Sequence, residues 1–325
     1  MKRKNTNSEQ SFRPRKIRVN IAPKINKWVV RQPIDFPIKI NTIDDLLTIA
    51  WNYKGSENTK TFDWTKLWLL IPSLTELRNM VGMEDLKTNI IDLILYCIGG
   101  QDFCTTYFHT IISGPYGCGK TEVANIIAKI YIRLGLTSDK LTSITRDELV
   151  GVKNLLEKAQ EGILFVDESC SPSDDFSSVI DILNKNLPTT RQKLTCIIIA
   201  NDDDIEKYFF SISLGTKTKF PWHFSISKYS AKDLLEIFKY RVKGDGWLLD
   251  EGAITEDFFV KNSVSFLAYG RDIFMLVLMC KMAHTKNIFA TTLVRYTMTK
   301  EDIKAGFNKY KNMVKKEHIP PSYIG

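Results

Sequence analysis

The sequence predicts an α/β protein, in which helices cover both faces of a parallel sheet, followed by a small all-α domain. Three observations lead to this prediction. Short apolar segments of strand length alternate with helical segments between residues 107 and 201. One of these apolar segments runs directly into the glycine-rich stretch GPYGCGKT at 114–121. Beyond residue 228 only helical patterns follow, so a second, helical domain is expected there.

The chain begins with a basic segment that lacks the pattern of a folded domain. Residues 1–31 hold ten Lys/Arg and one acid, a net charge of +9, whereas the whole chain carries +8. The basicity therefore belongs to this segment, and the rest of the chain carries −1. We expect residues 1–38 to form a disordered or extended arm. Such an arm is equally consistent with weak nucleic-acid contact through residues 1–31, a nuclear address or simple solvation.

The region 39–100 reads as a helical lead-in. In TIDDLLTIAWNY, Thr42 is placed to cap a helix that starts at Ile43 and has acids in its first turn. The stretches DWTKLWLLIPSLTELRNMVG and MEDLKTNIIDLILYCIGG continue the helical pattern, and the second ends at Gly99.

The region 101–228 carries the alternating pattern of an α/β nucleotide-binding domain. Strands are expected at 107–113, 141–145, 162–169 and 194–201, and helices at 120–135 and 174–187. A helical lid domain is expected over 229–316, with helices at 231–243, 255–267, 271–285 and 300–316, before a tail at 317–325.

Residues 114–121 match G-x-x-x-x-G-K-[ST], the P-loop or Walker A pattern. Glycines let successive backbone N–H groups turn toward phosphate oxygens, and a helix opening at Lys120 directs its positive end at the same anion. Lys120 is expected to reach the β- and γ-phosphates, and Thr121 to supply a hydroxyl to Mg²⁺. The predicted nucleotide-binding residues here are Gly114, Pro115, Tyr116, Gly117, Cys118, Gly119, Lys120, Thr121 and Glu122.

A second set of polar residues follows buried strands. In ILFVDE, Asp167 is expected to hold Mg²⁺ through water, and Glu168 to polarise the attacking water as in a Walker B motif. Asn201 ends the apolar run CIIIAN and is expected to orient the same water, although Asn at a strand end is also a common turn former. Arg271 opens a helix of the second domain and could lean over the γ-phosphate, with a surface ion pair as the alternative.

The composition indicates the cellular compartment in which the chain is expected. No C-x-x-C pair or Cys/His cluster occurs among the six cysteines, so buried thiols in a reducing compartment are expected rather than zinc ligands or disulfides. The longest apolar runs, such as IFMLVLMC at 273–280, fall short of the roughly 20 residues that cross a bilayer. A cytoplasmic or nuclear location without a membrane partner is therefore expected.

Taken together, the segments LTELRNMVGMEDLKTNI, HTIISGPYGCGKTEVANIIAKIYIRLGL, RDELVG, GILFVDES, CIIIAND, KFPWHFSISKYSAKDLLEIF and GRD resemble those of a known family. Residues 40–316 are similar to the AAA+ ATPases of the CbxX/CfqX type, whose relatives include Rubisco activases, a bacterial sporulation ATPase and versions from large DNA viruses. A viral chain of this kind would act in its host cell.

The resemblance implies a Mg²⁺-dependent ATPase that assembles as a hexameric homo-oligomer, with ATP bound at each subunit boundary. It further implies that Val81 and Gly82 line the adenine pocket, and that Asn201 and Arg271 act as the two nucleotide sensors.

The sequence departs from the family pattern in three places. The aromatic-glycine pore loop expected after RDELVG (146–151) is missing. Lys219, with Lys217 close by, stands where family members carry an arginine that reaches the neighbour's γ-phosphate, and lysine lacks the planar fork of that arginine. The usual D-E-A-Y reads DESC, which keeps both acids.

Three functions remain open on this sequence. The first is an ATP-hydrolysing ring that remodels an unknown protein client. The second is an ATP-binding structural or regulatory switch with slow or no hydrolysis, which the missing pore loop and Lys219 favour. The third is a DNA-replication type of ATPase that uses the basic arm.

Overall fold

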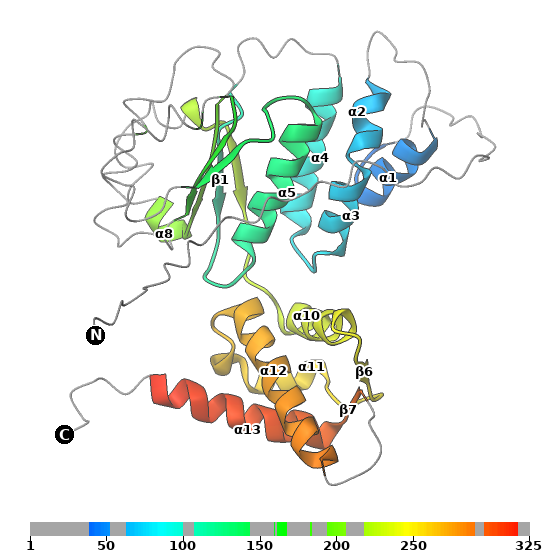
Figure 1. Ribbon diagram of the computed structural model, residues 1–325, viewed down its shortest axis with the longest axis vertical. Coiled ribbons are helices and arrows are strands. Elements are labelled where there is room, and N and C mark those ends of the chain that lie inside the picture. The colour runs from blue at the N-terminus through cyan, green and yellow to red at the C-terminus, as the bar shows by residue number, and fades with distance from the viewer. Residues whose placement is uncertain are drawn as a thin grey trace, which may run out of the picture.

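The computed structural model describes residues 39–52, 63–99, 107–143, 161–167, 194–205, 218–289 and 296–317, and the single residues 159 and 183. Figure 1 shows a body built on a sheet and, below it, a smaller helical body that we call the lid. The predicted fold class is confirmed, because helices flank a parallel sheet and a helical domain follows it. None of the described helices is long and apolar enough to cross a membrane.

The main sheet has five parallel strands in the order β2-β3-β4-β1-β5. Their bounds are β1 Thr110–Ser113, β2 Leu141–Ser143, β3 Ile163–Asp167, β4 Thr195–Ala200 and β5 Trp222–Ser225. The residues of β1 and β4 are all buried, as expected for central parallel strands that read as apolar runs. Because β1 lies between β4 and β5, the loop that leaves β1 enters the crevice at the carboxyl ends of the strands, where open α/β sheets bind ligands.

The strand β5 is absent from the predicted strands. Only Phe224 of its four residues is buried, so no apolar run marks this edge strand in the sequence. Its register pairs Thr110 with Trp222, and it is fixed by the neighbouring strand β1. Of the predicted helix at 174–187, the structure describes only Leu183.

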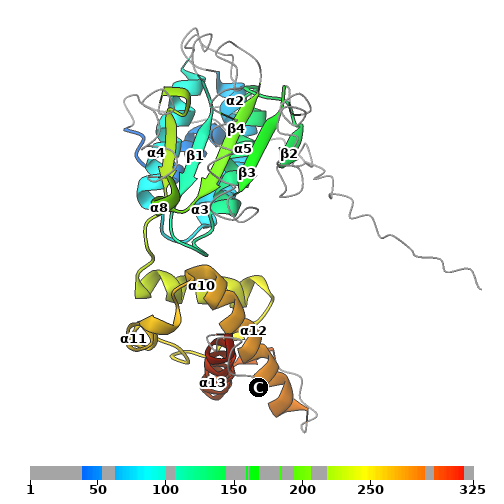
Figure 2. The same ribbon diagram turned by 90° about the vertical axis from the view of Figure 1, so that its left-hand side faces the viewer.

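Helices α4 (Glu84–Ile98) and α5 (Lys120–Arg133) cover one face of the sheet, and α1 (Ile43–Asn52), α2 (Trp64–Leu69) and α3 (Ile71–Asn79) pack outside them (Figures 1 and 2). The predicted cap at Thr42 is confirmed, because its hydroxyl accepts from Asp45 N–H at 3.2 Å and Asp45 Oδ2 accepts from Thr42 N–H at 2.9 Å. The stretch 63–82 forms two helices rather than one. Pro72 stands in the first turn of the second helix, where a missing N–H costs nothing.

The lid is built from α10 (Ala231–Gly244), α11 (Glu256–Lys261), α12 (Tyr269–Ile288) and α13 (Lys300–Glu317). The helix predicted at 255–267 ends at Lys261, and a 3₁₀ turn, η5 (Ser263–Ser265), follows. Two short strands, β6 (Leu248–Leu249) and β7 (Thr297–Met298), pair in parallel, so the lid is not purely helical as the sequence pattern predicts. These two-residue strands are too short to show a period in the sequence.

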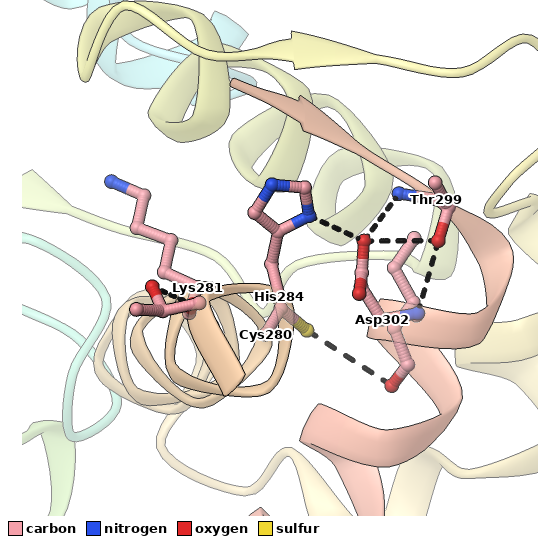
Figure 3. A network of polar contacts seen from close by, with 7 residues as sticks. Cys280, Lys281, His284, Thr299 and Asp302 are labelled. Atoms are coloured by element: carbon pink, nitrogen blue, oxygen red, sulfur yellow. Dashed lines mark hydrogen bonds and ion pairs between the residues drawn. The ribbon is translucent and has the colours of Figure 1, made fainter. Parts of the chain in front are cut away.

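A buried polar network joins α12 to α13 inside the lid (Figure 3). Asp302 Oδ2 lies 2.8 Å from His284 Nδ1 and accepts from both the N–H and the hydroxyl of Thr299, at 3.0 and 2.9 Å. Nearby, Gly306 lets the helices approach closely, because a Cβ at this position would lie 2.6 Å from the backbone of Cys280. Polar pairing and a small residue thus fix the crossing of the two longest lid helices.

Candidate functional site

Residues 114–121 connect the end of β1 to the start of α5, as the strand–loop–helix context predicts. Gly114, Gly117 and Gly119 have φ values of +148°, +74° and +95°, in the region that side-chain-bearing residues rarely adopt. At Gly114 a Cβ would also lie 2.8 Å from the carbonyl oxygen of Ile226. The glycines are therefore required by the backbone path of this phosphate loop.

Lys120 is the first residue of α5, and its ammonium group turns back over the loop. Lys120 Nζ donates to the carbonyl oxygens of Gly114 and Pro115 at 2.8 and 3.0 Å, and to Asn201 Oδ1 at 2.9 Å. Asn201 follows β4, the strand beside β1. The fold thus brings the predicted lysine and the predicted water-orienting amide into direct contact.

Thr121 and Asp167 form the second half of the site. The Thr121 hydroxyl donates to Asp167 Oδ2 at 3.4 Å, and Asp167 is the last residue of β3. Glu168, the predicted partner of the attacking water, lies outside the described residues.

These groups face a cavity of about 920 Å³ between the sheet body and the lid. Among the predicted site residues, its lining includes Val81, Tyr116, Gly117, Cys118, Gly119, Lys120, Thr121, Glu122, Asp167, Asn201 and Arg271. Gly82 follows Val81 with a φ of +65° and faces Tyr229 and Asp233, which would lie 3.5 Å from a Cβ there. Ten of the predicted positions thus share one cavity with Arg271, which comes from the lid.

The cavity is also lined by residues that the sequence patterns do not single out: Met80, Tyr229, Ile237, Tyr240, Arg241 and Phe274. Tyr229 is the most informative of these, because its hydroxyl donates to the Cys118 carbonyl oxygen at 2.9 Å. It stands just before the Ser230–Asp233 capping box that starts α10. That box marks the helix start in the sequence, but a contact with a loop so distant along the chain leaves no sequence signal.

Cys118 contributes its backbone to the loop, and its thiol is buried. Burial raises the pKa of this thiol to about 11, so the reactive thiolate is scarce near neutral pH. The other cysteines that the structure describes, Cys97, Cys196 and Cys280, are also free and buried.

Lys219 lies away from this cavity. It precedes β5, at the end of the sheet where β1 begins, and its positive charge acts on His109, the residue before β1. The phosphate loop leaves the opposite end of β1, a strand of 4 residues, or about 13 Å. The structure does not bring Lys219 together with Lys120 of the same chain.

His109 is a buried histidine between the starts of β1 and β4. Its Nδ1 accepts from the Cys196 N–H at 3.0 Å, and its ring lies beside Phe220 with centroids 5.4 Å apart. Burial lowers the pKa of His109 to about 4, and the charge of Lys219 acts in the same direction. Neutral His109 therefore connects the segment of Lys219 to the two central strands.

The donor set fits a magnesium nucleoside triphosphate. The glycine backbone shapes an anion cradle at a helix N-terminus, and Lys120 supplies a positive charge there. In the described part of the chain no group of three His, Cys, Asp or Glu side chains could hold a metal by itself. Mg²⁺ is typically held by one or two carboxylates together with waters and phosphate oxygens. The Asp167 carboxylate and the Thr121 hydroxyl would supply the protein ligands of such a site.

This sheet order, phosphate loop and helical lid define a P-loop nucleotide-binding protein of the AAA+ class. No family model matches the chain. The chain is 32% identical over 291 residues to the cfxQ-like protein R730 of Acanthamoeba polyphaga mimivirus, covering 82% of this chain and 72% of that protein. The chain therefore belongs to the AAA+ ATPases of the CfxQ/CbxX type, and the resemblance noted in the sequence is confirmed.

The chain is also similar to more distant proteins. Stage V sporulation protein K of Bacillus subtilis is 26% identical over 200 residues, which cover 55% of this chain and 62% of that protein. CfxQ of Xanthobacter flavus is 28% identical over 183 residues, which cover 49% of this chain and 57% of that protein. Among solved structures, Thermotoga maritima RuvB, a Holliday junction branch migration motor, has 17% identity and a TM-score of 0.46 over 70% of each chain.

Proposed function

We propose that this chain binds ATP with Mg²⁺ in the cavity between sheet body and lid and hydrolyses it. The observation that carries the proposal is the convergence of two contacts in one cavity. Lys120 Nζ meets Asn201 Oδ1 at 2.9 Å, and the Thr121 hydroxyl meets Asp167 Oδ2 at 3.4 Å. The first pair joins a phosphate-binding charge to a group that can orient water, and the second joins two groups that can hold a cation.

Each residue has a separate task in this proposal. Lys120 and the loop N–H groups bind the phosphates, and Thr121 and Asp167 hold the metal ion. Glu168 polarises the attacking water and Asn201 orients it, while Arg271 reaches from the lid toward the γ-phosphate. Bound Mg²⁺ would supply positive charge that neutralises the phosphate oxygens. Val81 and Gly82 are proposed to line the pocket for the adenine base. Positioning and charge stabilisation are then almost all that the protein contributes to in-line attack by water.

The site is proposed to be completed by a neighbouring subunit. Lys219 lies at the opposite end of β1 from the phosphate loop of its own chain, away from that cavity, so we propose that it serves a site on another copy. This placement supports a homo-oligomeric ring, of six subunits by analogy with the family. A lysine in this place offers a point charge instead of a planar fork, so slow turnover is expected.

The work done by hydrolysis is proposed to be the remodelling of a protein client. The near-neutral charge beyond residue 31 supports a protein rather than a nucleic acid as partner. The segment RDELVG and the expected place of a pore loop lie outside the described residues. If the basic arm alone contacts nucleic acid, as in a DNA-replication type of ATPase, deletion of residues 1–31 will abolish that binding. Persistent binding by the truncated chain would place the surface on the folded body.

A second candidate is an ATP-dependent switch that hydrolyses slowly or not at all. The contacts between the lid and the phosphate loop favour it, because they give bound nucleotide a direct way to change the position of the lid.

The experiment compares wild type with Lys120→Ala and Glu168→Gln, measuring ATP affinity and Mg²⁺-dependent phosphate release over a range of protein concentration. Lys120→Ala should weaken ATP binding on the order of 100-fold, as expected for loss of a charged contact. Glu168→Gln should keep binding and lose turnover. Lys140→Ala, an exposed lysine outside the cavity, is the matched control and should change neither. Binding without turnover in wild type would favour the switch, and no ATP binding would overturn both candidates.

A further inference from the structure

Three consecutive residues of the phosphate loop contact the lid or the segment that leads into it. The hydroxyl group of Tyr116 accepts a hydrogen bond from Arg271 Nη1, and the Gly117 carbonyl accepts one from Gly270 N–H at 3.1 Å. The Cys118 carbonyl accepts from the Tyr229 hydroxyl at 2.9 Å. The lid therefore rests on the loop through polar contacts at defined atoms.

The contact between Tyr116 and Arg271 is the one made entirely by side chains. Arg271 Cζ lies 5.0 Å from the centroid of the Tyr116 ring, and both residues line the cavity that holds Lys120 and Thr121. Tyr116 is 54% exposed, so its ring does not form part of the hydrophobic core. A tyrosine that is not needed for packing thus holds a lid arginine at the edge of the phosphate loop.

We propose that Tyr116 is a positioning residue for Arg271, which it holds at the phosphate end of the cavity in readiness for the γ-phosphate of ATP. This inference rests on the proposed function, in which Arg271 reaches that phosphate. It assigns to the Tyr116 side chain a role separate from the loop's backbone contacts with phosphate.

The chemistry of the pair suits this role. A guanidinium has five N–H donors, so a phenol that accepts one of them leaves the others for phosphate oxygens. Tyrosine is neutral, so the full positive charge of Arg271 remains available, whereas a carboxylate partner would neutralise it. Arginine also loses side-chain conformational entropy when it is fixed, and prior fixation reduces that loss at the moment of binding.

The backbone beside Arg271 is held in an unusual conformation. Tyr269 has a φ of +41°, which is rare for a residue with a large side chain. Its ring packs against that of Tyr229, with centroids 5.8 Å apart, and Tyr229 in turn bonds the phosphate loop. Such a conformation persists when the surrounding contacts determine it, so the start of α12 is fixed relative to the loop at the point where Arg271 emerges.

The test measures the affinities of the full chain for Mg²⁺–ATPγS and for ADP by calorimetry, in wild type, Tyr116→Phe, Arg271→Ala and the double variant. Phenylalanine keeps the ring and removes only the hydroxyl that accepts from Arg271. Tyr116→Phe should lower the ratio of ATPγS to ADP affinity roughly threefold to tenfold, because the pair is exposed and its bond is weaker than a buried one. Arg271→Ala should lower that ratio further, and Tyr116→Phe should then have no additional effect.

Tyr296→Phe, at an exposed lid tyrosine outside the cavity, is the control and should leave the ratio unchanged. The inference would be overturned if Tyr116→Phe left the ratio of ATPγS to ADP affinity unchanged, including by weakening the binding of both nucleotides equally. It would also be overturned if Tyr116→Phe still lowered the ratio in the Arg271→Ala background. ATPγS binding that needs Lys120 but is insensitive to Arg271→Ala would overturn it while leaving ATP binding in place. Absence of ATPγS binding in wild type would instead overturn the proposed function itself.

Discussion

The carbonyl oxygen of Gly117 accepts a hydrogen bond from the backbone N–H of Gly270, 3.1 Å away. The donor lies in the first turn of α12, where helix N–H groups have no partner within the helix. The phosphate loop thus provides a hydrogen-bond acceptor for an N–H group at the start of the longest lid helix. Movement of the loop is therefore expected to move the lid. The proposed function depends on this connection, because nucleotide binding must alter something beyond its own cavity.

Gly117→Ala should separate the lid from the loop. A Cβ at Gly117 would lie 2.1 Å from the Ala268 carbonyl oxygen, and the φ of +74° adds about 1–2 kcal/mol of backbone strain. We expect nucleotide affinity to fall at least about tenfold and the melting temperature to drop. Gly135→Ala is the matched control, since Gly135 has a φ of +72° and nothing within 4 Å of a Cβ, so it reports the strain alone. Equal effects of the two variants in a nucleotide titration would show that the contact with the lid is unimportant.

His109 should make the free energy of unfolding depend on pH. Its pKa is lowered in the folded chain from 6.5 to about 4, so the unfolded chain binds a proton in this range that the folded chain does not. The contribution of neutral His109 to the free energy of unfolding is therefore fully present above about pH 6.5. It falls by about 3 kcal/mol as the pH drops to 4. Denaturant unfolding of wild type and His109→Asn at several pH values measures this loss.

Asparagine can still accept the Cys196 N–H but does not titrate, so the His109→Asn curve should be flatter between pH 6.5 and 4. Some slope will remain, because burial also lowers the pKa of His223. Parallel curves of unfolding free energy against pH for the two proteins would show that His109 is not the source of this pH dependence.

Asp302→Ala should loosen the lid while leaving the sheet body intact. Asp302 is buried and accepts from Thr299 twice as well as contacting His284, so its removal should cost about 3 kcal/mol. Hydrogen exchange should speed up in α12 and α13 but not in β4. Glu301→Ala, at the exposed neighbouring position, should have a much smaller effect. Uniform exchange changes throughout the chain would show that the network does not act within the lid alone.

Much of the fold can be predicted from the sequence because its signals are local. The buried strands β1 and β4 read as apolar runs, Thr42 and Asp45 mark a helix start, and the glycines of the phosphate loop are dictated by its φ values. These features depend on a few adjacent residues, so a single sequence reveals them.

The parts that escape prediction depend on contacts between distant residues. The strand β5 exists because β1 lies beside it, although its own residues are mostly not buried. Tyr229 and Tyr116 reach their partners only once the lid has folded against the loop. The place of Lys219 relative to the phosphate loop follows from strand order, which no local pattern specifies.

A mixing experiment tests most directly whether ATP is hydrolysed at a site shared between two copies of the chain. Lys219→Ala subunits keep the phosphate loop, whereas Lys120→Ala subunits bind ATP on the order of 100-fold more weakly but still offer Lys219. We expect each variant alone to release phosphate at least about tenfold more slowly than wild type, by analogy with the loss of a charged finger. An equimolar mixture should exceed the sum of the two separate rates, because Lys219 of one variant completes the loop of the other. A mixture that only averages the separate rates would contradict the shared site.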